Sequence, residues 1–330
     1  MHAWQVQRHG PPSDALSRVV VDEPVPGPGE VRLRVRAAGI GLPDALMCRG
    51  KYAFSPKLPF VPGQEVCGTV DAVGPGVELP FGARLMAVTN FFDGHGGFAE
   101  ATIARSESIF RVPDVLRDQD AAVFRIGYST AWIGLVRRGG LRRSEWLLVL
   151  GAAGGSGLAA IRLGSALGAR VIGVVSGETK RELCARSGAD VIVDRTVGSV
   201  HDEVMEVTGG HGVDVVYDPV GGAFAGATAR CLAPGGRLLA VGFASGKWVE
   251  ADVSELVLRN ASIVGVYAGG QTRAEANADH ESLLTLAADG RLGGATAAVS
   301  FDALPEALGA VDRGEAVGKL VLQVGELATK

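Results

Sequence analysis

A glycine-rich run at residues 151–157 constrains the fold more than any other feature of the sequence. It reads Gly-Ala-Ala-Gly-Gly-Ser-Gly and follows the short apolar stretch Trp146–Leu150, which predicts a buried strand. A helical stretch comes next and ends near Leu167, before Gly168. Glycines let the backbone approach a ligand closely, and a helix start offers free N–H groups and a positive dipole end. The run therefore predicts an anion site at a strand–helix junction.

Apolar strands and helical stretches alternate from about Asp118 onward, which predicts parallel βαβ units and a doubly wound six-stranded Rossmann sheet. A helix is expected over Glu178–Arg186. In this context the glycine spacing indicates a dinucleotide pyrophosphate site rather than a purely structural turn. We expect the pyrophosphate to bind at Gly154, Gly155, Ser156 and Gly157. The expected strands are Trp146–Leu150, Arg170–Val175, Val191–Val193, Val213–Tyr217, Arg237–Val241 and Ser262–Tyr267.

The end of the second strand indicates which dinucleotide binds. NAD-binding sheets usually place an acid there for the ribose hydroxyls, but this sequence continues Val175-Ser176-Gly177. The hydroxyl of Ser176 and the cations Lys180, Arg181 and Arg195 could instead hold a 2′-phosphate. The pattern favours NADPH. Two alternatives stay open: Glu178 could turn toward a ribose, and the cations could be solvated surface charges.

The chain before Asp118 contains short strands separated by Gly and Pro, typical of a mostly β unit. Two helices, Ala274–Asp289 and Leu304–Arg313, and the strand Lys319–Val324 are expected to pack back onto it. We therefore expect an α/β protein in which residues 1–124 and 269–330 form the mostly β domain and residues 125–268 form the Rossmann domain. The expected early strands are Arg18–Val21, Val31–Val35, Glu65–Ala72, Arg84–Val88 and Gly97–Thr102.

The composition limits the classes of partner that we expect the protein to bind. The net charge is −4 and no basic block stands out, which argues against nucleic acid or an anionic membrane as a partner. No apolar run is long enough to cross a bilayer, and the start lacks a signal pattern. The four cysteines are widely spaced without a C-x-x-C pair, which fits a reducing cytoplasm and buried thiols better than disulfides or nucleophiles.

Several motifs resemble the medium-chain dehydrogenase/reductase superfamily, and within it the zinc-free quinone oxidoreductases of the zeta-crystallin type. The resemblance covers essentially the whole chain. It implies a GroES-like catalytic domain beside the Rossmann domain, an active site in the cleft, and homodimers joined through the edge strand near Ser262–Tyr267. The motifs lie at residues 37–44, 59–68, 96–100, 213–222 and 318–322.

The resemblance also addresses the metal. Zinc-dependent relatives carry a Cys, a His, and a Cys or Asp at the places held here by Gly41, Gln64 and Ile126. None of these is a good zinc ligand, and three protein ligands are normally required. The four-cysteine structural zinc lobe is also missing, and His95 alone cannot make a site. The resemblance therefore implies hydride transfer without a metal.

Individual site residues follow from the same resemblance. Tyr52 matches a tyrosine that lines the substrate cleft, and Gly41 replaces the usual Asn and widens the pocket. Asp44 and Glu65 are interpreted as structural, and aromatic residues such as Phe91, Phe92 and Tyr128 as a possible apolar wall. The resemblance also implies contacts to the cofactor. Thr130 should pack beside the nicotinamide, and the backbone of Val241, Gly242 and Phe243 should contact the nicotinamide ribose and carboxamide. Lys319 should contact a phosphate or ribose of the cofactor, unless it forms a surface ion pair instead.

The resemblance implies an NADPH-dependent reductase of quinones or other conjugated carbonyl compounds. Three alternatives remain: an enone or 2-alkenal reductase, an alcohol dehydrogenase with an unrecognised metal, and a non-catalytic NADPH-binding protein like some zeta-crystallins.

Overall fold

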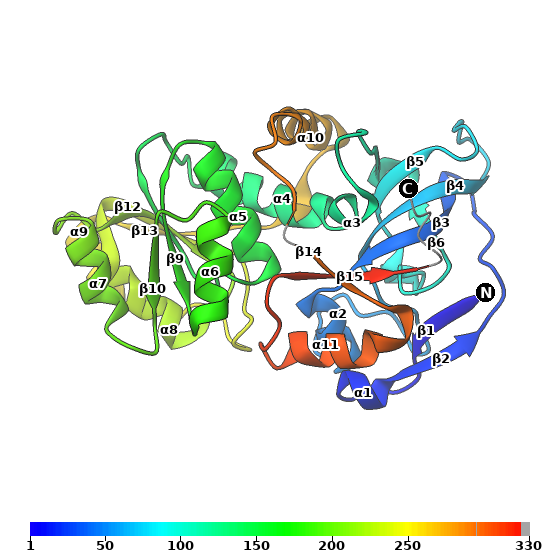
Figure 1. Cartoon of the computed structure of the whole chain (residues 1–330), viewed down its shortest axis with the longest axis horizontal. Helices are drawn as coiled ribbons and strands as arrows, with labels where there is room; N and C mark the ends of the chain where they lie inside the picture. The colour runs from blue at the N-terminus through cyan, green and yellow to red at the C-terminus, as the bar shows by residue number, and fades with distance from the viewer. Residues whose placement is uncertain (295, 325–330) are drawn as a thin grey trace. The chain divides into compact units, whose positions relative to one another are not determined.

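The computed structural model describes residues 1–294 and 296–324. The chain forms two compact units, one comprising Met1–Ile126 with the chain from Thr296 onward, the other Gly127–Ala295. The first unit is mostly β and the second is a doubly wound α/β unit (Figure 1). The α/β fold class expected from the sequence is confirmed.

The first unit is built on a seven-stranded, largely antiparallel sheet in the order β14-β15-β3-β4-β5-β7, with β6 paired to β3; β1 and β2 form a separate pair. Its strands are β1 His2–Val6, β2 Leu16–Val20, β3 Glu30–Gly39, β4 Glu65–Val73, β5 Arg84–Val88, β6 Ala101–Arg105, β7 Ile109–Arg111, β14 Thr296–Val299 and β15 Lys319–Gln323. Its helices are α1 Pro12–Ala15, α2 Leu42–Cys48, α3 Asp118–Ala121 and α11 Leu304–Asp312.

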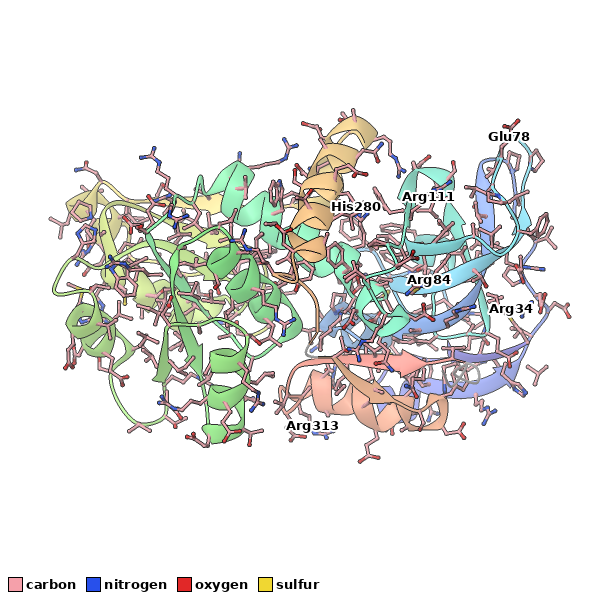
Figure 2. The ribbon with its side chains drawn as sticks, turned by 45° about the horizontal axis from the view of Figure 1, so that its top comes forward. Arg34, Glu78, Arg84, Arg111, His280 and Arg313 are labelled. Atoms are coloured by element: carbon pink, nitrogen blue, oxygen red, sulfur yellow. The ribbon has the colours of Figure 1, made fainter. Side chains whose placement is uncertain are left out.

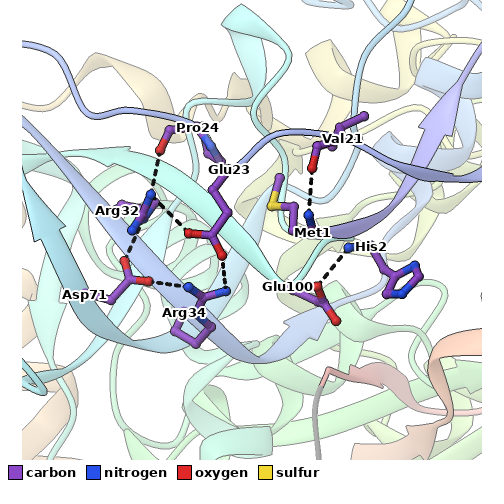
Figure 3. Close-up of polar contacts among 9 residues, drawn as sticks. All are labelled: Met1, His2, Val21, Glu23, Pro24, Arg32, Arg34, Asp71 and Glu100. Carbon is purple, nitrogen blue, oxygen red and sulfur yellow. Dashed lines mark hydrogen bonds and ion pairs between the residues drawn. The ribbon is translucent and has the colours of Figure 1, made fainter.

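Alternation along β3 explains how this sheet buries one face. Val31 and Leu33 point into the core, whereas Arg32 and Arg34 point outward. Both arginines bind Asp71, at 2.8 and 2.7 Å, and both also pair with Glu23, as Figure 3 shows. The outward cations of this strand are therefore neutralised by acids rather than gathered into a basic patch.

Other arginines of the first unit follow the same rule. Arg34, Arg84 and Arg313 lie at separate places on this unit (Figure 2). Arg84 pairs with Asp118 at 2.6 Å and Arg313 with Glu315 at 2.8 Å.

Within residues 1–294 and 296–324, no helix combines the length and apolar character that a bilayer span needs.

The second unit contains six parallel strands in the order β10-β9-β8-β11-β12-β13. The central strands are buried on both faces, as expected for a sheet covered by helices on each side. All six strands predicted from the sequence are present. They are β8 Trp146–Val149, β9 Arg170–Val175, β10 Val191–Asp194, β11 Val213–Asp218, β12 Leu232–Ala240 and β13 Ser262–Gly265.

Helices flank this sheet, with α5 and α6 on one side and α7, α8 and α9 on the other (Figure 1). The helix predicted over Glu178–Arg186 is present with these bounds as α6. The remaining helices are α4 Phe124–Trp132, α5 Gly155–Ala166, α7 Val200–Val207, α8 Gly222–Ala227, α9 Val253–Arg259 and α10 Arg273–Ala288, and a π-helical turn covers Ile133–Arg138.

The second domain boundary differs from the sequence expectation. Helix α10 groups with the Rossmann unit, which extends to 295 instead of ending at the expected 268. A long-range ion pair joins α10 to this unit: Arg137, in the π-helical turn, binds Asp279 of α10 through two N–H groups, at distances of 2.8–3.0 Å. The first boundary is observed after 126, close to the expected 124.

All four cysteines are buried and unpaired. Burial raises the pKa of the Cys48 and Cys67 thiols to about 12, and that of Cys184 and Cys231 to about 11. Thiols with such pKa values are poor nucleophiles, because the thiolate is the reactive form. The interpretation of these residues as small buried hydrophobes is confirmed.

Candidate dinucleotide and substrate sites

The glycine-rich run forms the turn between β8 and α5. Gly151 adopts a left-handed φ of +55°, and Gly154 is the N-cap residue of α5. In the part of the chain that the structure describes, no side chain caps this helix start, so the N–H groups of its first turn have no side-chain partner there. An exposed and uncapped helix N-terminus behind a glycine turn suits a pyrophosphate.

Gly154 and Gly157 have different environments. A Cβ at Gly157 would lie 2.4 Å from the carbonyl oxygen of Gly151 and 2.7 Å from Cα of Ala152, closer than real Cβ atoms approach. A Cβ at Gly154 would meet only the oxygen of Gly151, at 3.3 Å. Gly157 is therefore required by the packing of the helix on the turn, whereas Gly154 leaves open space at the helix start.

Ser156 is oriented by a buried tyrosine that the sequence analysis did not single out. Its Oγ lies 2.9 Å from the hydroxyl of Tyr217, at the end of β11. Tyr217 is fully buried, and this burial raises the pKa of its phenol above the ordinary value. The hydroxyl pair connects the glycine turn to the middle of the sheet and fixes the side chain of Ser156.

The end of β9 carries no acid that points toward a ribose. Ser176 is half-buried there, and Glu178, the alternative ribose contact considered from the sequence, is 75% exposed and lies 3.7 Å from Arg181. The nearby acid is Asp194, at the end of β10. It accepts hydrogen bonds from Gly177 N at 3.0 Å and from Thr196, and the Thr196 bonds lower its pKa. Asp194 thus holds the β9–α6 turn.

Three of the four residues predicted for the 2′-phosphate belong to neighbouring elements. Ser176 follows β9, Lys180 is half-buried in the first turn of α6, and Arg195 follows β10, the strand paired with β9. Arg195 is exposed, with its guanidinium 5.6 Å from the ring centre of Phe224. A hydroxyl and two cations at the carboxyl ends of adjacent parallel strands suit an anionic ligand.

A buried aspartate shapes the next turn along the sheet. Asp218 ends β11 with no exposed surface, and its Oδ1 accepts hydrogen bonds from Val220 N and Gly221 N at 2.8 Å. Its main-chain oxygen accepts from Val241 N and Gly242 N, at 2.9 and 3.2 Å. Burial raises the pKa of Asp218. This residue, which the sequence analysis left without a role, connects the β11–α8 turn to the predicted nicotinamide contacts.

The remaining predicted cofactor contacts of this unit lie at accessible positions. Val241, Gly242 and Phe243 follow β12 and are half-buried, and Phe243 packs against Trp248 with ring centres 4.9 Å apart. Thr130 is half-buried in α4, and the hydroxyl of its neighbour Tyr128 accepts from Gly293 N at 3.0 Å. Tyr128 is therefore part of the core rather than an apolar wall.

In the first unit, Gly41 marks the start of α2. Asp44 accepts from Gly41 N at 2.9 Å through Oδ2 and from Gly63 N at 3.1 Å through Oδ1. Its carboxyl is almost completely buried, and burial raises its pKa to about 7 despite the attraction of Lys319. The interpretation of Asp44 as structural agrees with these two backbone bonds.

Glu65 and Lys319 form an ion pair beside this turn. Lys319 Nζ lies 3.0 Å from Glu65 Oε1, and Ile126 N donates to Glu65 Oε2 at 3.1 Å. The Lys319 side chain is 22% exposed, so the pair is mostly buried rather than the surface pair considered from the sequence.

The three positions at which the resemblance places zinc ligands do not offer a donor set. Gly41 has no side chain, Ile126 is apolar, and the buried Gln64 offers an amide whose Nε2 has no partner among the described residues. Across residues 1–294 and 296–324, His, Cys, Asp and Glu nowhere cluster in a group of three that could hold a metal. These residues do not fit a zinc ion.

Tyr52 begins a strip of aromatic rings, which we call the aromatic strip. Its ring lies 5.8 Å from that of Phe54, which lies 5.9 Å from Phe92, and Phe92 stacks on Phe91 at 4.0 Å. Phe54 and Phe92 are 45% and 53% exposed. Exposed aromatic rings in edge-to-face arrangement offer an apolar surface for an aromatic ligand.

Each of the two units matches the model of a known protein family. The model of the alcohol dehydrogenase GroES-like domain matches residues 27–114, and that of the zinc-binding dehydrogenases matches residues 155–284. The quinone oxidoreductase-like protein 2 homolog of Nematostella vectensis is 35% identical over 303 residues, which are 90% of this chain and 82% of the relative. This chain belongs to the medium-chain dehydrogenase/reductase superfamily, in its quinone oxidoreductase-like branch.

Solved structures of this superfamily include members with different chemistry. Mycobacterial Rv1454c complexed with NADPH is 31% identical, with a TM-score of 0.89 and coverage of 98% of this chain and 99% of the other. An NAD-dependent alcohol dehydrogenase is 27% identical, with a TM-score of 0.87 and coverage of 98% and 100%. The family therefore establishes an oxidoreductase, while its members differ in the nicotinamide cofactor.

Proposed function

We propose that this protein is an NADPH-dependent oxidoreductase that reduces a quinone or another conjugated carbonyl compound without a metal. The choice of a dinucleotide cofactor rests on the uncapped start of α5 behind the glycine turn. The choice of NADPH rests on Ser176, Lys180 and Arg195, which lie where an NAD-binding sheet would carry an acid. The NADPH complex of Rv1454c supports the same cofactor.

Bound NADPH would supply the hydride, and the protein would supply position and charge stabilisation. The N–H groups of the first turn of α5 would hold the pyrophosphate, Ser176 and the two cations the 2′-phosphate, and Thr130 with Val241, Gly242 and Phe243 the nicotinamide end. In the overall reaction one quinone, one NADPH and one proton give hydroquinone and NADP⁺. A quinone requires no proton donor at carbon, because its product is an aromatic diol that solvent can protonate at oxygen.

Two features of the first unit support this substrate class. Gly41, Gln64 and Ile126 do not fit zinc, which disfavours alcohol oxidation through a metal alkoxide. The aromatic strip offers an apolar surface of edge-to-face rings beside Tyr52, whose hydroxyl could also bind a substrate oxygen. A planar conjugated ring suits these features better than a small aliphatic alcohol does.

The predicted homodimer would form through the edge strand β13. Ile263 and Tyr267 are 39% and 66% exposed, and Val257 and Leu258 of the adjacent α9 are 68% and 77% exposed. A second copy of the strand would pair the open edge and cover these side chains. The four reduced thiols fit a cytoplasmic location.

Steady-state oxidation of NADPH with a panel of quinones and a panel of enones and 2-alkenals tests the proposal. Turnover of quinones, undiminished by chelator, is the expected result. Turnover of enones alone would favour the enone reductase alternative. Tight NADPH binding without turnover on either panel would identify a non-catalytic binding protein, and one zinc per chain in elemental analysis would overturn the metal-free part.

A further inference from the structure

Lys319 is placed beside Gly41 by the pairing of two strands distant in sequence. β15 runs antiparallel to β3, with Val321 opposite Gly39, and Ile40 N donates to the oxygen of Leu320 at 3.0 Å. This register brings the first residue of β15 alongside the start of α2. The Lys319 Nζ lies 3.6 Å from the point at which a Cβ would stand on Gly41.

Two buried acids fix the position of this ammonium group. Glu65 lies 3.0 Å from Nζ, its side chain is 4% exposed, and its second oxygen is held by Ile126 N. Asp44, fixed by two backbone N–H groups, also attracts the ammonium electrostatically. Because the carboxylates are anchored to the backbone, the lysine head is held in place with little freedom to move.

Among the described residues, Glu65 accepts from only one of the donors of this ammonium. It has three N–H groups, and its one ion-pair partner in the described part of the chain is Glu65. The neighbouring Gly41 has no side chain to occupy the space next to Nζ, and the lysine side chain is 22% exposed. A ligand oxygen beside Gly41 could therefore accept a hydrogen bond from Lys319.

We propose that Lys319 is a catalytic residue that donates a hydrogen bond to the carbonyl oxygen of the substrate. When a carbon of the conjugated system accepts the hydride, negative charge develops on this oxygen, and a fixed ammonium stabilises it. Solvent supplies the proton that completes the reduced product. The inference rests on the proposed function, and it assigns Lys319 to the substrate rather than to the cofactor phosphate or ribose expected from the sequence.

Kinetics of Lys319→Met separates these two roles. Loss of one donor to a developing oxyanion lowers kcat by roughly 10²–10³-fold. We expect a loss of this order, with the Kd for NADPH unchanged, and partial recovery of kcat in Lys319→Arg. A large rise in the NADPH Kd with kcat retained would show that Lys319 serves the cofactor and would overturn the inference.

A second readout needs no turnover. A bound 4-nitrophenol reports the charge beside it, because its phenolate is coloured and its phenol is not. We expect wild type to bind the phenolate with an apparent pKa at least about one unit below that in Lys319→Met, a tenfold preference. This titration tests Lys319 even if no quinone or enone is reduced, an outcome that would refute the proposed function alone.

The variant Lys319→Met leaves Glu65 buried without its cation, so stability must be controlled. The double variant Lys319→Met/Glu65→Gln removes both charges, and thermal unfolding shows which variants are folded. A folded variant lacking Lys319 that keeps wild-type kcat, or a wild type that shows no preference for the phenolate, would overturn the assignment.

Discussion

Gly154→Ala separates the fold of the glycine turn from its capacity to bind a dinucleotide. Gly154 has φ −82° and ψ 166°, which an L-residue adopts without strain, and the new methyl would meet one oxygen at 3.3 Å. Ala is a poorer N-cap than Gly by about 0.5–1 kcal/mol, and the stiffer unfolded chain offsets about 0.4–1 kcal/mol of this. The free energy of unfolding without cofactor should therefore change by less than about 0.5 kcal/mol.

The cofactor should respond far more strongly. The methyl would stand in the open space through which a pyrophosphate reaches the first N–H groups of α5. Losing one hydrogen bond to a charged group costs about 1.5–3 kcal/mol, which corresponds to a Kd roughly 10–150-fold higher. Fluorescence titration with NADPH measures the Kd, and chemical denaturation measures the stability of the same preparation.

Gly157→Ala is the matched control, because its Cβ would overlap backbone atoms at 2.4–2.8 Å. This variant should lose about 1–3 kcal/mol of stability with or without cofactor. A Gly154→Ala protein that binds NADPH with wild-type affinity would refute the placement of the pyrophosphate at this turn. A Gly154→Ala protein as unstable as Gly157→Ala would refute the claim that the space there is open.

Three further predictions concern cofactor choice, assembly and pH. Ser176→Asp should lower kcat/KM for NADPH at least about tenfold relative to kcat/KM for NADH, because the new carboxylate repels a 2′-phosphate. An unchanged ratio of the two kcat/KM values would show that the 2′-phosphate binds at another place. Ile263→Asp should yield a monomer by light scattering, since it places a charge on the exposed edge strand β13; a dimer at wild-type strength would place the interface on another surface. Burial raises the pKa of Asp44 from 3.8 to about 7, so the folded state binds this proton more tightly and the free energy of unfolding should fall as pH rises from about 4 to about 7. This decrease in the free energy of unfolding should not exceed about 4 kcal/mol and should be absent in Asp44→Asn. Chemical denaturation across this pH range measures it. The same dependence of the free energy of unfolding on pH in both proteins would contradict the raised pKa.

The parts of the fold that could be predicted are those that depend on patterns of residues close together in the sequence. The six parallel strands and the turn at Gly154 follow from apolar runs, helix periodicity and glycine spacing, all within a few residues of each other. The short strands β1, β7 and β14 carry too little pattern to be seen. The strand expected at Gly97–Thr102 is observed later, as β6 Ala101–Arg105.

The features that the sequence missed depend on contacts between distant residues. Tyr217 orients Ser156 from 61 positions away, and Arg137 holds α10 through Asp279 across 142 positions. Asp194 and Asp218 stand directly at strand ends, a signal that could have marked them as turn-forming acids. The Glu65–Lys319 pair required knowledge that β15 lies against β3, which no local pattern contains.

The most direct test of a metal-free NADPH-dependent hydride transfer uses stereospecifically deuterated NADPH and enzyme dialysed against a strong chelator. We expect full turnover of a quinone substrate, less than stoichiometric zinc, and a primary isotope effect with label in only one of the two C4 positions. Activity that disappears on chelation and returns with added zinc would contradict it.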